Sequence, residues 1–329
     1  MQMNARERVL RTVRRQTPDR TPYLRWDNLE LSDFVAPWAR KAENMTPVRK
    51  DWVDEWGCRW QTIDTTVGQV VSHPIKAAFD YSSFSVPKPV LDRANLEANR
   101  EEYGDRVSVG GVGYFFFERL EKLRGFNDAM MDLLAERDRI DDLLNRLTAY
   151  YMELVDMYAD SDLVDCIGVN EDLGLQERLT ISPSMWREIF RPHYRTVYEH
   201  IHARGLLVFQ HSCGYVQDII SDLAEIGVDI LELQQLACMD MDVVTQNRGQ
   251  MVITAPVDIQ AVLPTGDWSR IKAFQEKLFK AFDSVEGGYI AQMYCDLPSL
   301  GVAKELDDRL QSLILDLCRW RGEGTMEGA

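Results

Sequence analysis

The sequence His-Ser-Cys at positions 211–213 carries two side chains that bind transition metals, and it follows an apolar run typical of a buried strand. Alternate residues of a strand point the same way, so His211 and Cys213 are expected on one face. Cys295, which also follows an apolar stretch, is predicted to add a second thiolate. One imidazole and two thiolates suit Zn²⁺ better than Mg²⁺ or Ca²⁺. The pattern predicts a zinc site, with ordinary core packing of these residues as the alternative.

Carboxylates near the predicted strand ends are candidates for a fourth zinc ligand and for catalysis. Glu232 shares one strand face with Ile230 and Gln234, and a glutamate pointing inward needs a cation to offset its burial. The alternative is a charged residue at the rim. Glu171 and Asp172 are predicted catalytic carboxylates together with Glu232, acting by orienting the substrate or the metal ligands.

Aromatic and acidic side chains at other predicted strand ends are candidates for substrate binding. An apolar pocket lined by aromatic rings would suit a methoxylated ring, with core packing as the alternative fate of these rings. The predicted substrate-binding residues are Trp26, Asp27, Tyr114, Asp258 and Tyr294.

Composition and charge limit the class of protein. The chain has 329 residues, 45% of them hydrophobic, with a formal net charge of −16. A protein with such a large negative charge repels phosphate backbones and anionic lipids. Neither nucleic acid nor a membrane is therefore expected as a partner. Six cysteines are too few for a disulfide framework, which predicts reduced thiols. The sequence shows no apolar run typical of a membrane span or a signal peptide, which predicts a cytoplasmic location. The oligomeric state is left open, a homodimer included.

Short apolar runs alternate with amphipathic stretches from residue 106 onward, a pattern that predicts βα units around a parallel sheet. Residues 1–105 are less regular: a helix over 4–16 precedes the first strand, then loops, a hairpin and short helices. A further helix is predicted to begin at Ser182 and to end at Arg204, before Gly205. The predicted strands are 23–26, 107–116, 163–169, 206–211, 228–233, 251–257 and 288–294.

These seven strands, with an eighth hidden in the irregular third, predict a single (β/α)₈ TIM barrel over 1–329. The barrel is favoured over a doubly wound open sheet because polar residues follow so many strands, and in a barrel these positions converge on one mouth. The glycines at 110–113 lack the spacing of a dinucleotide-binding loop, and the chain contains no Gly-x-Ser-x-Gly sequence for a nucleophilic serine.

Several segments together resemble the uroporphyrinogen decarboxylase superfamily, which implies a (β/α)₈ barrel. The segments are Asn4–Leu10, Pro18–Pro22, Asp54–Gly57, Ile181–Glu188, His211–Gly214 and Ile226–Asp229. The decarboxylases carry an arginine-rich motif after the first strand, whereas this chain has only Arg25 there. The chain is similar instead to the zinc-dependent branch, the methylcobamide:coenzyme M and O-demethylase methyltransferases, whose His-x-Cys and distant Cys fall on His211, Cys213 and Cys295.

The resemblance implies a zinc-dependent methyltransferase that works with a corrinoid carried on a separate protein. Its other substrate would be a small methylated compound, such as a methoxylated one, or a thiol or folate acceptor. Two other functions stay open at this point: a metal-free decarboxylase of a small or tetrapyrrole acid, and a barrel that binds a ligand without catalysis.

Overall fold

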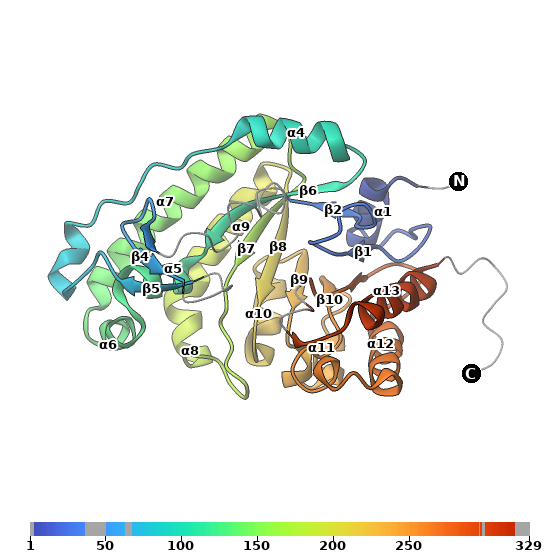
Figure 1. Cartoon of the computed structure of the whole chain (residues 1–329). Helices are drawn as coiled ribbons and strands as arrows, with labels where there is room; N and C mark the ends of the chain where they lie inside the picture. The colour runs from blue at the N-terminus through green and yellow to red at the C-terminus, as the bar shows by residue number, and fades with distance from the viewer. Residues whose placement is uncertain (1–2, 37–50, 63–67, 296, 298–299, 320–329) are drawn as a thin grey trace.

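The computed structural model describes residues 3–36, 51–62, 68–295, 297 and 300–319, and its centre is an eight-stranded parallel sheet (Figure 1). The strands, in sheet order, are β1 (Tyr23–Leu24), β11 (Tyr289–Gln292), β10 (Val252–Ala255), β9 (Ile230–Leu233), β8 (Leu207–Ser212), β7 (Cys166–Asn170), β6 (Val107–Tyr114) and β2 (Phe34–Val35). The sheet curls into a nearly closed barrel, which confirms the predicted (β/α)₈ fold. The hidden eighth strand is β2.

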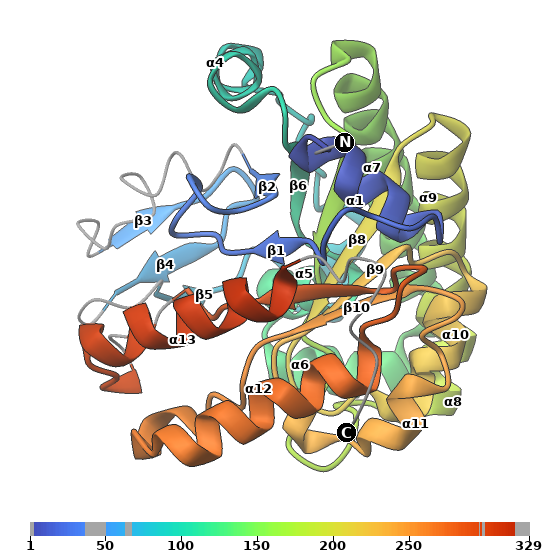
Figure 2. The same cartoon turned by 90° about the vertical axis from the view of Figure 1, so that its right-hand side faces the viewer.

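Helices alternate with the strands and surround the sheet (Figure 2). They are α1 (Ala5–Val13), α4 (Arg93–Tyr103), α5 (Phe116–Arg124), α6 (Phe126–Ala135), α7 (Arg137–Ser161), α8 (Pro183–Met185), α9 (Arg191–Ala203), α10 (Ile220–Glu225), α11 (Met241–Thr245), α12 (Trp268–Phe282) and α13 (Lys304–Cys318). No helix in these described ranges is both long and apolar enough to cross a membrane.

The predicted helix over 182–204 is interrupted by a wider turn. The Ser182 hydroxyl accepts a hydrogen bond from the Met185 N–H at 3.2 Å, which confirms the predicted cap, and Gly205 follows the end with a φ of 78°. Between α8 and α9, residues Trp186–Phe190 form a π-helical turn. Pro192 lacks the N–H that would bond to the Glu188 carbonyl, so the helix widens there.

The barrel interior is filled by alternate strand residues that meet in one apolar cluster. Its members are Leu24, Phe34, Ala36, Val107, Val109, Cys166, Phe209, Ile230, Val252 and Ile290, together with Val9 of α1. Two residues further toward the carboxyl end, the next inward position on each of four neighbouring strands is polar. These four residues are His211, Glu232, Thr254 and Gln292.

Asp33 closes the seam between β1 and β2, which are the two edges of the sheet. Its backbone N–H donates to the Tyr23 carbonyl at 2.8 Å, and its side chain accepts from the Tyr23 N–H at 2.8 Å. The same carboxylate is paired with Arg8 at 2.6 Å and Arg20 at 2.8 Å. One buried aspartate thus ties α1, β1 and β2 together.

The irregular amino-terminal third contains a second, antiparallel sheet of three strands. It consists of β3 (Asp51–Val53), β4 (Arg59–Gln61) and β5 (Gln69–Ser72). Trp60 of β4 stacks on Trp52 and on Tyr114, each pair of rings 5.8 Å apart, so this sheet packs where β6 ends.

Candidate metal centre at the barrel mouth

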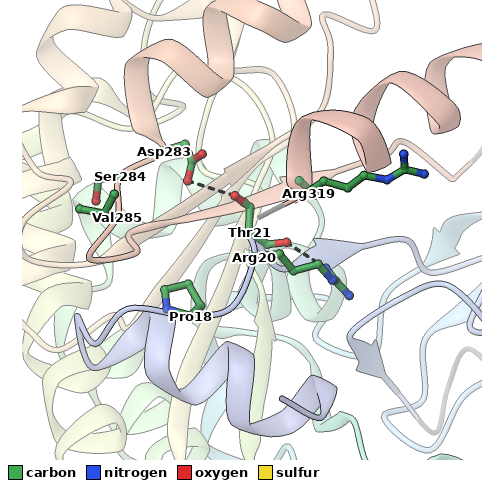
Figure 3. A pocket seen from close by; sticks show the side chains of 8 residues that line it. Pro18, Arg20, Thr21, Asp283, Ser284, Val285 and Arg319 are labelled. Carbon is green, nitrogen blue, oxygen red and sulfur yellow. Dashed lines mark hydrogen bonds between the residues drawn. The ribbon is translucent and has the colours of Figure 1, made fainter. Parts of the chain in front are cut away.

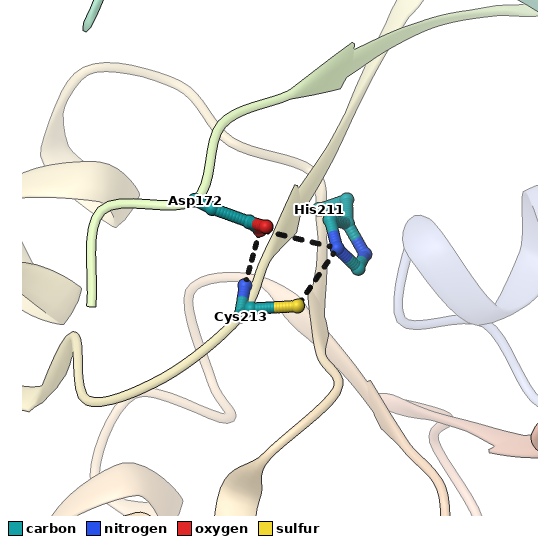
Figure 4. Close-up of side chains that lie close together, drawn as sticks. All are labelled: Asp172, His211 and Cys213. Carbon is teal, nitrogen blue, oxygen red and sulfur yellow. Dashed lines mark hydrogen bonds and ion pairs between the residues drawn. The ribbon is translucent and has the colours of Figure 1, made fainter. Parts of the chain in front are cut away.

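Three side chains with metal-binding atoms meet at the carboxyl end of the barrel: Asp172 after β7, His211 on β8 and Cys213 just beyond it (Figure 4). Nε2 of His211 lies 3.5 Å from Sγ of Cys213 and 3.4 Å from Oδ1 of Asp172. All three ligand atoms lie within 4.8 Å of one another. The structure therefore brings the predicted His211 and Cys213 together and adds a carboxylate to them.

Two glycines hold the loops that carry these side chains in close contact. A Cβ on Gly214 would lie 2.2 Å from the carbonyl oxygen of Gly174, and a Cβ on Gly174 would lie 2.3 Å from the N atom of Tyr215. Because a side chain at either position would collide with backbone, the loops after β7 and β8 can pack this closely only through glycine. The Cys213 N–H then donates to Oδ1 of Asp172 at 2.8 Å.

Glu232 lies on the other side of the His211 ring. Its Oε2 is 2.8 Å from Nδ1, the ring nitrogen that faces away from Asp172 and Cys213. The amide of Gln292 donates to the other Glu232 oxygen, and the Thr254 hydroxyl donates to the Gln292 oxygen at 3.2 Å. A carboxylate on one imidazole nitrogen orients the ring and leaves the other nitrogen free to bind a metal.

The electrostatics of this cluster favour a positive charge. Burial works against the imidazolium of His211, but hydrogen bonds to Asp172, Cys213 and Glu232 outweigh it and raise the pKa of His211 well above its usual range. Burial tends to raise the pKa of the Asp172 carboxyl, but its contacts with His211 outweigh burial and lower that pKa overall. Burial raises the pKa of the Cys213 thiol. A metal cation could replace the imidazolium and thiol protons in such a site.

The donor set and its spacing fit zinc. Bonds of about 2.0–2.3 Å at tetrahedral angles place neighbouring ligand atoms about 3.3–3.6 Å apart. The observed separations of 3.5 and 3.4 Å from Nε2 of His211 match that spacing. A nitrogen, a sulfur and a carboxylate oxygen are also the ligand types that zinc accepts.

Cys295 and Glu232, the other two predicted zinc ligands, are not members of this group of three. Cys295 is half-buried and lies three residues beyond the end of β11. Glu232 contacts the opposite nitrogen of the imidazole. Zinc ligation by either residue stays a prediction.

Glu171, a predicted catalytic residue, is fully buried and caps helix α5. One of its oxygens accepts a hydrogen bond from the Glu118 N–H at 2.8 Å, in the first turn of α5. Glu118 in turn accepts from the Asp172 N–H at 3.1 Å. Burial raises the pKa of Glu171 well above its usual range and that of Glu118 to about 7. The two glutamates clasp α5 to the loop that carries Asp172; a catalytic role for Glu171 stays a prediction.

The predicted substrate-binding residues lie at strand ends but several already have partners. Trp26 packs edge-on against Phe34 and Phe209 in the barrel interior. Asp27 is paired with Arg25 at 2.7 Å, and Asp258 accepts hydrogen bonds from the backbone of its own loop. Tyr114 and Tyr294 are half-buried. Contact of these five residues with a substrate stays a prediction.

Gln292 and Glu118 are two site residues that the sequence reasoning missed. A signal for Gln292 existed, because it stands two positions after the inward Ile290 on the predicted last strand. The sequence contains no such signal for Glu118, because its contact with the Asp172 backbone joins two different βα units.

A small cavity of about 30 Å³ lies at the opposite end of the barrel (Figure 3). It is lined by residues that precede β1 and β11, among them Arg20, Thr21 and Asp283, and the Thr21 hydroxyl donates to Asp283 at 3.1 Å. A volume of this size holds only a few water molecules, so the cavity is no candidate for a substrate site.

One solved structure agrees with the fold over almost the whole chain, and a second is less similar. A methyltransferase from Methanosarcina mazei superposes with a TM-score of 0.72 at 16% identity, covering 95% of this chain and 99% of that one. A putative vitamin-B12 independent methionine synthase from Listeria monocytogenes gives a TM-score of 0.48 at 13% identity, covering 70% of each chain. No curated protein matches the sequence.

The family model described as uroporphyrinogen decarboxylase (URO-D) matches residues 61–300. That range contains Asp172, His211 and Cys213, and it spans most of the barrel strands. Because the match extends over more than half of the sequence, the chain belongs to the uroporphyrinogen decarboxylase family.

Proposed function

We propose that this protein is a zinc-dependent methyltransferase, which moves a methyl group between a small methylated substrate, or a thiol or folate acceptor, and a corrinoid carried on a separate protein. The observation that carries the proposal is the meeting of an imidazole, a thiol and a carboxylate at the barrel mouth with the spacing of a tetrahedral zinc site. The family assignment and the methyltransferase fold of the Methanosarcina mazei protein support it.

His211 and Cys213 would hold the zinc, with Cys295 as the predicted second thiolate. For the carboxylate we favour Asp172 over Glu232, because Asp172 faces Nε2 of His211 and Glu232 faces Nδ1. Zinc would supply Lewis acidity, which keeps a thiol deprotonated or makes a methoxy oxygen a better leaving group. A reducing cytoplasm, as the cysteine content predicts, would keep both thiols available.

Glu232 would act by holding the Nδ1 proton of His211, which fixes the tautomer with its lone pair on Nε2. Gln292 and Thr254 hold Glu232 in place. Beneath these residues the apolar floor of Trp26, Phe34 and Phe209 keeps water out of the barrel interior. The mouth itself is the side from which a corrinoid domain could deliver its methyl group.

The state of Arg25 weighs against the decarboxylase alternative. This arginine is 7% exposed, and its guanidinium is paired with Asp27 at 2.7 Å and with Asp307 at 2.9 Å. Gln311 accepts a further hydrogen bond from it at 2.8 Å. With its donors engaged, Arg25 anchors α13 and has none to offer the carboxylates of a tetrapyrrole.

Metal analysis and a methyl-transfer assay test the proposal together. Purified protein is expected to contain about one zinc per chain and to convert cob(I)alamin to methylcobalamin with one of a panel of methoxylated, methylthio and methylamine compounds. His211→Ala should lose both the metal and the turnover. His200→Gln, on α9 and paired with Asp156, is the matched control and should keep both. Protein that carries no metal yet releases CO₂ from an acid would refute the proposal.

A further inference from the structure

Arg119 is a buried arginine without a counter-ion among the residues that the structure describes. It is 5% exposed, yet it forms no ion pair with any residue that the structure describes, and its Nε has no hydrogen-bond partner. The other arginines buried to this degree, Arg8, Arg25 and Arg124, each contact at least one carboxylate within 3 Å. Burying a charge without a partner is costly, and an anion bound to Arg119 would offset that cost.

Aromatic rings surround the Arg119 guanidinium. Its central carbon lies 3.9 Å from the centre of the Trp56 ring and 5.7 Å from that of Tyr114. The Tyr151 hydroxyl is a polar neighbour, and its own proton is donated to the Tyr114 carbonyl at 2.7 Å. Ring faces attract a cation, but they do not supply the paired acceptors that a guanidinium fork binds best.

One amino group of Arg119 borders the barrel mouth. Gly113, near the end of β6, is exposed with a φ of 72°, and a Cβ placed on it would lie 3.7 Å from Nη2 of Arg119. The residue before Arg119 is Glu118, which binds the Asp172 backbone. Arg119 therefore directly follows a residue that helps to position the loop of the candidate metal centre.

Strand β6, which leads into the helix that carries Arg119, and strand β7, which leads to Asp172, have little side-chain bulk on their inward faces near their carboxyl ends. Gly111 on β6 and Gly168 on β7 are paired in register and half-buried. Gly111 continues the inward series of Val107 and Val109. A small ligand could lie over these two glycines and reach from Arg119 toward His211.

We propose that Arg119 binds the carboxylate of the methyl-bearing substrate, which makes that substrate a small organic acid. This inference rests on the proposed function and narrows its substrate class. A planar carboxylate can accept two parallel hydrogen bonds from one guanidinium, and one negative charge balances one positive charge. A phosphate dianion would need further donors. In a chain with a net charge of −16, an acid needs such a dedicated cation to bind at all.

Binding is measured first, because it does not depend on turnover. Trp56 stacks on Arg119, so intrinsic fluorescence should report an acid at this site. Methoxyacetate, 3-methoxybenzoate and inorganic phosphate are titrated in parallel with methoxybenzene, the neutral analogue. A methoxy acid is expected to bind saturably, and Arg119→Gln should weaken it about tenfold to a hundredfold, the loss typical of a charge-assisted bidentate contact. Arg119→Lys keeps the positive charge but not the planar guanidinium, so its affinity for the acid should lie between those of the parent and of Arg119→Gln.

The matched control is Arg309→Gln, because Arg309 also stacks on a tryptophan at 3.9 Å, Trp268, but on the exposed surface of α12 and α13. It should leave acid binding unchanged. Equal affinity for 3-methoxybenzoate and methoxybenzene, equal loss of both in Arg119→Gln, tighter binding of phosphate, or no saturable binding of either acid would each overturn the inference. Circular dichroism of each variant checks that it is folded.

Turnover separates this inference from the proposed function. If both hold, methyl transfer from the acid leaves the demethylated acid with its carboxylate intact, and Arg119→Gln raises KM for the acid more than it lowers kcat. Arg119-dependent binding without any methyl transfer would support the anion site and refute the methyltransferase. Methyl transfer from neutral compounds alone would support the methyltransferase and refute the anion site.

Discussion

The two ends of the barrel differ in how completely their buried arginines are paired with carboxylates. At the amino-terminal end, the carboxylate of Asp33 contacts Arg8 and Arg20, and Arg8 also contacts Asp19 at 2.6 Å. At the mouth, Arg119 has no ion pair with any carboxylate in the part of the chain described, and its Nε has no hydrogen-bond partner there. Paired charges at one end fix the fold, whereas polar groups without partners at the other are what a binding site leaves for its ligand.

Asp33→Asn should destabilise the amino-terminal end of the barrel and leave the structure of the mouth unchanged. The change removes the charge that Arg8 and Arg20 share and weakens the seam between β1 and β2, at an expected cost of about 3–5 kcal/mol in the free energy of unfolding. Urea unfolding monitored by circular dichroism measures this. Glu97→Gln, in an exposed pair with Arg93, is the control and should cost less than about 0.5 kcal/mol. Loss of zinc from a folded Asp33→Asn protein would show that the two ends are not separate.

Glu232→Gln should do the reverse, weakening the mouth without unfolding the protein. It removes the carboxylate that holds Nδ1 of His211, and zinc affinity is expected to fall about tenfold to a hundredfold. Competition with a chromophoric chelator measures the affinity. Thr254→Val, one step further along the same network, should have a smaller effect in the same direction. Unchanged affinity in Glu232→Gln would exclude the orienting role.

The smallest expected effect concerns a partly exposed histidine at the amino-terminal end, in the last turn of α9. His202 lies 2.8 Å from Asp229, and this hydrogen bond raises the pKa of His202. A raised pKa in the folded state means that the stabilisation is complete below the unfolded pKa of about 6.5 and is lost as the pH rises through the folded value. His202→Gln should therefore remove a few tenths of a kcal/mol of stability at pH 5.5 and little at pH 8.5. A loss of equal size at both pH values would contradict the assignment.

The period of two along a strand made part of the site predictable. It placed His211 beside Cys213 and turned Glu232 inward, and the structure brings His211 into contact with both. Strand β2 is only two residues long, too short to show a period, so the eighth strand could be expected but not located. The place of Asp172 depends on the close approach of Gly174 and Gly214, 40 residues apart in the chain, which no local pattern reveals.

The surroundings of Arg119 could not be predicted from the sequence. An arginine in an acidic chain is expected to find a carboxylate, and only the three-dimensional arrangement shows that, of the residues described, the rings of Trp56 and Tyr114 lie beside it. Glu171 is the converse case, since its position after a strand suggested catalysis while the structure shows it capping α5. Strand-end positions locate the mouth, but packing decides which residues face it.

X-ray absorption at the zinc edge of the purified protein tests the central claim most directly. The account predicts about one zinc per chain, with sulfur at about 2.3 Å and imidazole nitrogen at about 2.0–2.1 Å. Cys213→Ser should remove one sulfur from the first coordination sphere, while Cys238→Ser, outside the cluster, should leave the spectrum unchanged. Protein grown with ample zinc that binds none, or zinc whose ligands are the same in His211→Ala and Cys213→Ser as in the parent, would contradict it.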